Sequence, residues 1–210
     1  MKTEILKLEA GGALSAAAAV LRRDGVIVYP TDTFYGLGAC CYSRTAIRRI
    51  YRLKGRGFHK PLLVIISSRE MLNEITAERP AVVEKLINTF WPGPLTLVLS
   101  ASPRLPRELL GGSGSIGVRL PEYPEVRELV RRAGFPVTAT SANSAGGENI
   151  QRIERAVEHF SGRVDLILDG GETKGGIPST VLECTSSTPK ILRAGAVSAL
   201  RLKPYLESPS

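Results

Sequence analysis

Two hydrophobic patterns alternate along nearly the whole chain. Leu14, Ala17, Ala18 and Leu21 follow the i, i+3, i+4, i+7 spacing of an amphipathic helix. Residues 26–29 then form a continuous, mostly β-branched run that stops at a proline, which is typical of a buried strand. Because helix and strand patterns keep alternating, we expect an α/β domain whose helices pack on a mixed sheet.

The same patterns predict the remaining elements. Residues 5–8 are expected to form an edge strand, and residues 31–38 and 101–114 to form loops. No linker or internal repeat divides the chain, so residues 1–210 are predicted to form a single domain with a core from about 10 to 200. Helices are expected near 47–51, 69–75, 83–90, 126–133, 153–160 and 198–206, and strands near 62–66, 95–99, 116–120, 136–140, 166–168, 180–182 and 191–192.

Composition narrows the classes of function. The net charge of +8 favours polyanionic partners such as nucleotides, RNA or acidic membrane surfaces. Cys40, Cys41 and Cys184 have neither a disulfide framework nor a metal-ligand spacing, which fits a reducing cytosol. Two histidines are too few for a multi-histidine site, and no metal ligands are predicted. We see no targeting segment and no apolar run of the ~20 residues that a membrane span needs, so a cytoplasmic protein is expected.

Residues 53–63 combine three cations with two glycines. Lys54, Arg56 and Lys60 fall within this stretch, and Pro61 closes it before an apolar run. Glycine permits backbone angles that other residues avoid, and proline cannot continue a helix, so a short cationic loop between a helix and a strand is predicted. Arginine offers a planar fork of donors and lysine a mobile charge, which suits phosphate binding. On this stretch alone, a solvated surface turn is an equally good interpretation.

Polar side chains follow several predicted strands, and ligands of open α/β sheets bind beyond strand ends. Arg119 lies within an otherwise apolar strand, where a guanidinium is costly unless it meets an anion or a carboxylate. Pairing with a nearby acid is therefore the alternative to ligand binding for Arg119. The polar residues near strand ends are Thr31, Asp32, Thr33, Tyr35, Ser141, Asn143, Ser179, Thr180 and Arg193.

Other catalytic motifs are not supported. Residues 112–117 match GxGxxG, but they follow a loop and open a strand, whereas the dinucleotide-binding motif follows a strand and opens a helix. Neither His59 nor His159 has a motif-defined serine or cysteine partner. What remains is a basic cleft lined by hydroxyl groups, which suits positioning and charge stabilisation around phosphates without a covalent step.

Seven short motifs in order make the chain similar to a known family. They are YPTDTFYGLG at 29–38, KGR at 54–56 with KPL at 60–62, WPGPLT at 91–96, GVRLP at 117–121, TSAN at 140–143, PST at 178–180 and ILRAG at 191–195. Together they resemble the YrdC-like family of threonylcarbamoyl-AMP synthases. Each motif is weak, but seven in this order are highly specific, and the resemblance covers about residues 10–200.

The resemblance implies a twisted, mixed β-sheet with flanking helices around a large basic cavity. It implies that ATP, L-threonine and bicarbonate, with Mg²⁺ on the ATP, give threonylcarbamoyl-AMP and pyrophosphate. The product would serve a downstream transferase complex in the t6A modification of tRNA adenosine 37. Carried over by position, the resemblance implies catalytic roles for Lys54, Arg56, Ser141 and Asn143, ATP contacts from Arg56, Lys60, Ser115, Asn149 and Arg193, and threonine contacts from Thr33, Arg119 and Ser179.

Two positions depart from the family pattern. Many members have histidine where Ile65 stands, which would make the threonine pocket less polar here. Many have serine or threonine near Asn149, which exchanges one hydrogen-bonding side chain for another. The chain also ends soon after the core domain, so the extra C-terminal domain of longer members is expected to be lacking.

Two alternatives compete with a synthase. A double-stranded RNA- or tRNA-binding protein of the same fold would explain the net charge, but 6% aromatic residues offer little stacking surface. The ordered hydroxyl, Asn and Arg positions also favour a specific site over a diffuse phosphate-binding patch. A carbamoyl-transfer role, as in the related domain of hydrogenase-maturation proteins, would call for zinc-finger and acylphosphatase-like modules that this sequence does not contain.

Overall fold

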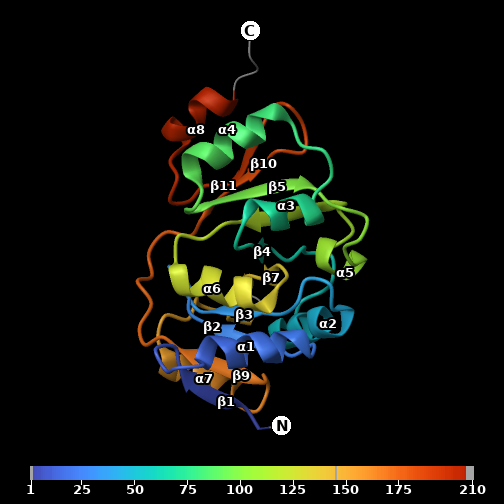
Figure 1. The fold of residues 1–210 in the computed structure, drawn as a ribbon. Coiled ribbons are helices and arrows are strands. Elements are labelled where there is room, and N and C mark those ends of the chain that lie inside the picture. Colours follow the sequence, from blue (N-terminus) through green and yellow to red (C-terminus); the bar gives the residue numbers. More distant parts are fainter. Residues whose placement is uncertain (1, 145, 207–210) are drawn as a thin grey trace.

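The fold was analysed in a computed structural model that describes residues 2–144 and 146–206 (Figure 1). Within these residues the strands form two mixed sheets. The first sheet has the order β1-β9-β2-β3-β8, with bounds Glu4–Lys7, Leu166–Asp169, Ile27–Tyr29, Gly36–Gly38 and Thr140–Ser141. The second has the order β11-β10-β5-β6-β4-β7, with bounds Lys190–Arg193, Thr180–Glu183, Leu95–Ser100, Ser115–Arg119, Val64–Ile65 and Val137–Thr138.

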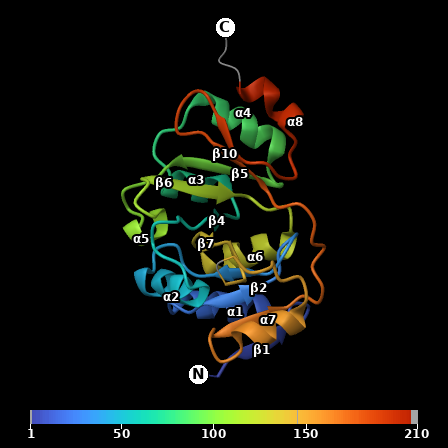
Figure 2. The same ribbon diagram turned by 180° about the vertical axis from the view of Figure 1, so that it is seen from behind.

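Helices cover both sheets. The N-terminal strand β1 and helix α7 lie at one end of the molecule, and α4 and α8 lie at the other, as Figures 1 and 2 show from opposite sides. Helix α2 begins where the Ser43 side chain accepts a hydrogen bond from the Ala46 amide at 3.1 Å, so Ser43 is its N-cap. The helices are α1 (Ala13–Arg22), α2 (Arg44–Lys54), α3 (Arg69–Ile75), α4 (Ala81–Phe90), α5 (Arg107–Leu110), α6 (Pro124–Ala133), α7 (Ile153–Phe160) and α8 (Ala199–Leu206).

One segment, residues 137–141, joins the two sheets. Its first half, β7, pairs with β4 of the second sheet, and its second half, β8, pairs with β3 of the first. At the junction, the Thr138 amide donates to the Ala39 carbonyl and the Thr138 hydroxyl accepts from the Ala39 amide, both at 2.9 Å. The two sheets are therefore linked by one crossing segment, through its backbone pairing and the Thr138 hydroxyl.

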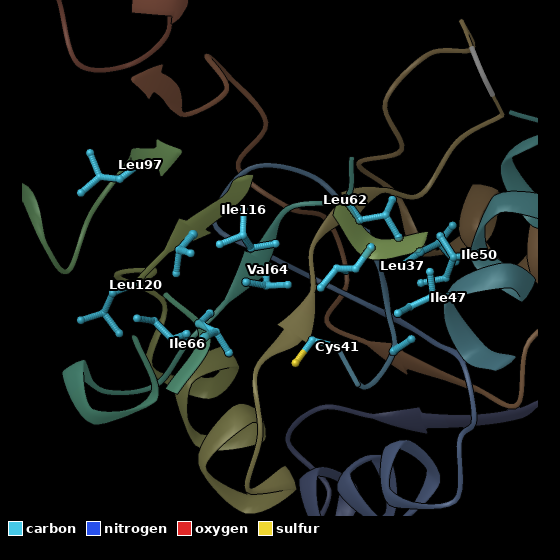
Figure 3. Close-up of a cluster of buried hydrophobic side chains, with 14 of the residues drawn as sticks. Leu37, Cys41, Ile47, Ile50, Leu62, Val64, Ile66, Leu97, Ile116 and Leu120 are labelled. Carbon is cyan, nitrogen blue, oxygen red and sulfur yellow. The ribbon is translucent and has the colours of Figure 1, made fainter. Parts of the chain in front are cut away.

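A shared hydrophobic core makes the two sheets one domain. Leu37 of the first sheet and Val64 of the second belong to one cluster of buried side chains, together with Ile47 and Ile50 from α2 (Figure 3). Burying a side chain of this size stabilises the fold by about 1.5–3 kcal/mol. A second cluster joins α1 and α6 to β2 and also includes Ile65 of the second sheet. Among the described residues, no helix is long and apolar enough to cross a membrane.

The predicted α/β class is confirmed, and so is the order of helices and strands. Three features differ from the prediction. The expected single sheet is divided into two linked sheets. Residues 36–38, predicted as loop, form strand β3, and residues 107–110, also predicted as loop, form helix α5. The sequence pattern did not predict strand β3, because Gly36 and Gly38 lack the branched side chains typical of strands. Glycine is required at Gly38, since a Cβ there would lie 2.8 Å from Cε1 of the Tyr29 ring.

The Thr138→Val substitution tests the sheet junction. Thr138 is fully buried, and valine keeps its shape but leaves the Ala39 amide without an acceptor. An unsatisfied buried donor costs about 1–3 kcal/mol, so we expect the free energy of unfolding to fall by that amount in urea denaturation. As a control, Thr45→Val on the exposed face of α2 should change it by less than about 0.5 kcal/mol. Equal stability of the Thr138→Val variant and the wild type would contradict this role.

Candidate active site

A cavity of about 390 Å³ lies between the two sheets and is lined by residues of both. Its volume falls in the range of small-molecule binding sites. Its charged lining residues are Arg56, Arg119, Arg193 and Asp32. Its lining residues with a hydroxyl or side-chain amide group are Thr31, Thr33, Tyr35, Thr96, Thr140, Ser141, Asn149 and Ser179.

The loop after β2 brings Asp32 and Thr33 to the cavity. The Thr31 hydroxyl accepts from the Thr33 and Phe34 amides at 3.2 Å each and donates to the Phe34 carbonyl at 2.6 Å. A threonine hydroxyl that satisfies its own turn in this way fixes the path of the backbone. The turn therefore holds Asp32 and Thr33 at the cavity wall before the chain continues into β3.

Lys54, at the end of α2, is buried and does not line the cavity. It is only 3% exposed, and its Nζ donates to the Ser141 carbonyl at 2.6 Å, the Asn143 carbonyl at 2.9 Å and the Asn143 Oδ1 at 2.8 Å. The Ser141 hydroxyl donates to the same Oδ1 at 2.7 Å. Three acceptors match the three protons of an ammonium group. Lys54, Ser141 and Asn143 are thus brought together as one network, and of the three only Ser141 lines the cavity.

Arg56 turns away from this network and lines the cavity. Its guanidinium lies over the Tyr51 ring at 5.4 Å and donates to the Pro61 carbonyl at 3.3 Å. Its Nε is buried and makes no hydrogen bond to a described residue. Burial lowers the pKa of Arg56, although a guanidinium remains charged at neutral pH. A cation with a spare buried donor at a cavity wall is suited to an anionic ligand.

Arg119, at the end of β6, forms an ion pair with Asp32 through Nη2 and Oδ2 and also lines the cavity. Its Nε donates to the Gly93 carbonyl at 2.9 Å. Arg119 therefore pairs with a carboxylate, which was the first interpretation of an arginine in an apolar strand. It also lines the cavity, which the second interpretation, ligand binding, requires. The two interpretations are compatible because a guanidinium carries five donors and these contacts use two.

Ser179 and Arg193 meet on the wall formed by the second sheet. Arg193 Nη2 donates to the Ser179 carbonyl at 2.7 Å and contacts its Oγ at 3.2 Å. The Ser179 hydroxyl also shares a hydrogen bond of 2.9 Å with Thr96, which is nearly fully buried. Burial and the nearby charge of Arg119 both lower the pKa of Arg193. Mutual repulsion of this kind is relieved when an anion binds between the two cations.

Of the other predicted site residues, two line the cavity and two do not. Thr33 and Asn149 line it, and Asn143 Nδ2 lies 3.5 Å from Asn149 Oδ1. Lys60 is exposed and outside the lining. Ser115 is also outside the lining, at the start of β6, where its hydroxyl lies 3.0 Å from that of Ser113. The structure therefore brings most of the predicted residues to one cavity but leaves Lys60 and Ser115 outside its wall.

Part of the wall is apolar. Ile65 is buried in β4 and lines the cavity beside Leu63 and Val126. Ile65, where many family members have histidine, is thus part of the cavity wall and gives this part of the wall an apolar surface. Such a surface suits a methyl group or another aliphatic part of a ligand.

Metal ligands are sparse. Among the described residues, no group of three or more His, Cys, Asp or Glu side chains could hold a metal ion. Asp32 is the only acid in the described cavity lining, and it is already paired with Arg119. A divalent cation at this site would therefore depend on oxygen atoms supplied by a ligand.

Comparison with known proteins identifies the family of this chain. The model of the Sua5, YciO and YrdC family, described as "Telomere recombination", matches residues 19–195. A threonylcarbamoyl-AMP synthase from Thiobacillus denitrificans is 36% identical over 87% of this chain and 96% of its own length. The chain belongs to the Sua5, YciO and YrdC family. A threonylcarbamoyl-AMP synthase from Pyrococcus abyssi is 39% identical over 86% of this chain but only 53% of its own length. The chain thus spans about half the length of that relative.

A solved structure of a Sua5/YrdC member supports the fold. It is described as Pyrococcus abyssi Sua5 complexed with L-threonine, and it aligns with a TM-score of 0.91. Identity is 33%, covering 99% of this chain and 62% of that one. The Sua5/YrdC fold that was expected from the seven motifs is therefore confirmed.

Sequence reasoning assigned no role to Asp32 or Thr96, although both line the cavity of this family member. Asp32 had been noted only as one polar residue of its loop. The signal that could have identified it is Arg119, since an arginine in an apolar strand needs a carboxylate nearby. Thr96 had no comparable signal, because a threonine within a strand is ordinary.

The network around Lys54 predicts a pH-dependent stability. Burial, with a smaller contribution from the charge of Arg56, lowers the pKa of Lys54 from 10.5 to about 8. The unfolded chain then binds this proton more tightly than the folded chain. The stability contributed by Lys54 should therefore rise as the pH increases from about 8 towards 10.5, and should be constant at its lower value below about pH 8.

Urea denaturation of the wild type and a Lys54→Met variant at several pH values measures this contribution, because other titrating groups cancel in the difference. We expect the wild type to gain stability relative to Lys54→Met between pH 8 and 10. The exposed Lys60→Met variant controls for general effects on the loop. A difference between wild type and Lys54→Met that does not change over this range would rule out a depressed pKa.

Proposed function

We propose that this chain is a threonylcarbamoyl-AMP synthase, a nucleotidyltransferase that converts ATP, L-threonine and bicarbonate to threonylcarbamoyl-AMP and pyrophosphate. The observation that carries the proposal is the convergence of Arg56, Arg119 and Arg193 on one cavity. Three fixed guanidinium groups favour ligands that together carry several negative charges, such as a polyphosphate and a carboxylate. The names of the relatives and the L-threonine bound to the Pyrococcus abyssi protein support the same substrates.

The proposed reaction has two steps. The threonine amine attacks the carbon of bicarbonate and gives a carbamate with loss of water. A carbamate oxygen then attacks the α-phosphorus of ATP, the bond to the β-phosphate breaks, and pyrophosphate leaves. Negative charge develops on phosphate oxygens during the second step, so preorganised cations contribute most of the catalysis. Arg56 and Arg193 have the charge and the position at the cavity wall for this role.

Lys54, Ser141 and Asn143 have a different role in the proposal. The Lys54 ammonium holds the Ser141–Asn143 segment through two hydrogen bonds to backbone carbonyls and one to the Asn143 side chain, and Lys54 does not line the cavity. It acts by positioning the Ser141 hydroxyl, which does line the cavity. Lys54 also adds a positive charge behind the wall, which favours anions in a site of low dielectric constant.

Mg²⁺ is proposed to enter with the nucleotide. It takes oxygen ligands in octahedral geometry and usually keeps several waters beside substrate phosphates. The described residues offer no protein cluster that would hold it independently. Mg²⁺-ATP is therefore treated as the substrate, and the protein's part is to bind the remaining charge of the polyphosphate.

The product is proposed to feed the t6A modification of tRNA adenosine 37 in the cytoplasm, by way of a downstream transferase complex. A direct RNA or tRNA contact is the second function considered. The exposed arginines of α2 favour it, although Arg44 and Arg48 are already paired with Glu108. RNA binding without adenylate formation is thus an alternative that the assay below separates from the synthase.

The synthase proposal is tested by pyrophosphate release from Mg²⁺-ATP. We expect release to require both L-threonine and bicarbonate, because the carbamate is the nucleophile. Omission of either one should reduce the rate to background, and mass spectrometry should detect the mixed anhydride in the complete reaction. Release that does not need threonine, or no release from a protein that binds RNA tightly, would reject the proposal.

Arg56→Ala tests the contribution of the cationic loop. Loss of one preorganised donor to a developing oxyanion typically costs ~10²–10³ in rate, so the pyrophosphate-release rate should fall by at least that factor. Arg56→Lys should recover only part of the loss, because an ammonium lacks the planar fork. Arg52→Ala is the matched control, since Arg52 lies in the last turn of α2, four residues before Arg56, but is exposed and outside the cavity lining. A turnover rate of Arg56→Ala close to that of the wild type would contradict a role of Arg56 in stabilising charge on the phosphate oxygens.

A further inference from the structure

The cavity has a marked charge asymmetry. Its described lining contains three cations, Arg56, Arg119 and Arg193, and a single acid, Asp32. An acid among cations has a simple structural explanation if both its carboxylate oxygens are paired with them. Here only one oxygen is paired: Oδ2 meets Arg119, whereas Oδ1 is buried and makes no hydrogen bond to a described residue. Leaving a charged acceptor unsatisfied costs more than leaving a neutral one, so the second oxygen calls for an explanation.

The substrates of the proposed function have the complementary asymmetry. The ATP phosphates, bicarbonate and the carboxylate of threonine are all anionic. The α-ammonium group of threonine is the only cationic group that a protein side chain must recognise. Asp32, the single acid in the described cavity lining, can therefore form a favourable pair with the α-ammonium group of threonine. This inference rests on the proposed function.

The geometry of Asp32 and Arg119 fits an amino acid. The two side chains form an ion pair at the cavity wall, with 23% and 12% of their surfaces exposed. A carboxylate and a guanidinium side by side match the ammonium and carboxylate groups that an α-amino acid carries on one carbon atom. The Asp32 Cβ–Cγ torsion is soft, so a small rotation presents either oxygen to the cavity while the other stays with Arg119.

Neighbouring contacts keep this pair in place. Arg119 is anchored by its Nε to the Gly93 carbonyl at 2.9 Å. Asp32 is held by the turn that the Thr31 hydroxyl closes. Groups fixed before a ligand arrives lose little entropy on binding, so they can orient it strongly.

We propose that Asp32 is a positioning residue that binds the α-ammonium group of the amino acid substrate through its carboxylate. Arg119 beside it binds the α-carboxylate, so the pair recognises the amino acid as a zwitterion. By fixing the nitrogen, Asp32 determines the face of the cavity at which the carbamate forms. ATP is bound by other cations and does not depend on Asp32.

Binding of L-threonine and its deamino analogue (R)-3-hydroxybutanoate tests this role directly. The two ligands share the carboxylate and the hydroxyl group and differ only at the ammonium. We expect the wild type to bind L-threonine about 10- to 100-fold more tightly, as a charge-assisted hydrogen bond of about 1.5–3 kcal/mol would give. In Asp32→Asn the two dissociation constants, measured by calorimetric or NMR titration, should become equal within about threefold.

Matched controls separate recognition from structure. Glu125→Gln removes an exposed acid one residue from Val126 of the lining and should keep the preference for L-threonine. The affinity of Asp32→Asn for ATP should change by less than about threefold, and its melting curve should remain cooperative.

Three outcomes would overturn the inference. Equal weakening of both ligands in Asp32→Asn would mean that Asp32 only orients Arg119. A raised Mg²⁺ requirement for ATP binding, with threonine binding unchanged, would make Asp32 a metal ligand. An unchanged preference for L-threonine would remove any role at the ammonium. These titrations do not need turnover, so a protein that binds L-threonine through Asp32 but releases no pyrophosphate would reject the synthase proposal and keep this one.

Discussion

The fold depends on the segment from Val137 to Ser141, which belongs to both sheets. Strand β7 completes the second sheet beside β4, and two residues later β8 completes the first sheet beside β3. Thr138 is fully buried at the junction, whereas Ala139, Thr140 and Ser141 line the cavity. The cavity is thus a consequence of how the two sheets are joined.

Positive charge in such a cavity has to be supported by the surrounding structure. The three arginines each have at least one protein acceptor or ring contact: Pro61 and Tyr51 for Arg56, Gly93 and Asp32 for Arg119, and Ser179 for Arg193. These contacts fix the guanidinium groups but use only part of their donors. Burial and repulsion by Arg119 lower the pKa of Arg193, although its guanidinium remains charged at neutral pH. An anion bound between the two cations would relieve this repulsion.

Periodicity predicted most of the elements, because the apolar stripe of a helix and the β-branched run of a buried strand report directly on burial. It failed where the structure uses neither signal, as in strand β3, whose glycines accommodate the Tyr29 ring. The resemblance of seven motifs identified residues that line the cavity, including Thr33, Arg119 and Ser179. It could not show which side chains face the ligand, since that depends on contacts between segments far apart in sequence. Asp32 escaped assignment for this reason.

Lys54 and Arg56 illustrate the limit most clearly, because they are two residues apart and perform opposite tasks. Helix α2 ends at Lys54, and Gly55 follows with φ of 61°, a left-handed conformation that glycine adopts without strain. The change of backbone direction sends the Lys54 side chain to the Ser141–Asn143 loop and the Arg56 side chain to the cavity. Lysine suits the first position because three oxygen atoms surround a compact ammonium. Arginine suits the second because its planar donors can meet a phosphate while the ring of Tyr51 supports its face. One glycine therefore divides the cationic loop into a buried structural cation and a cation that lines the cavity.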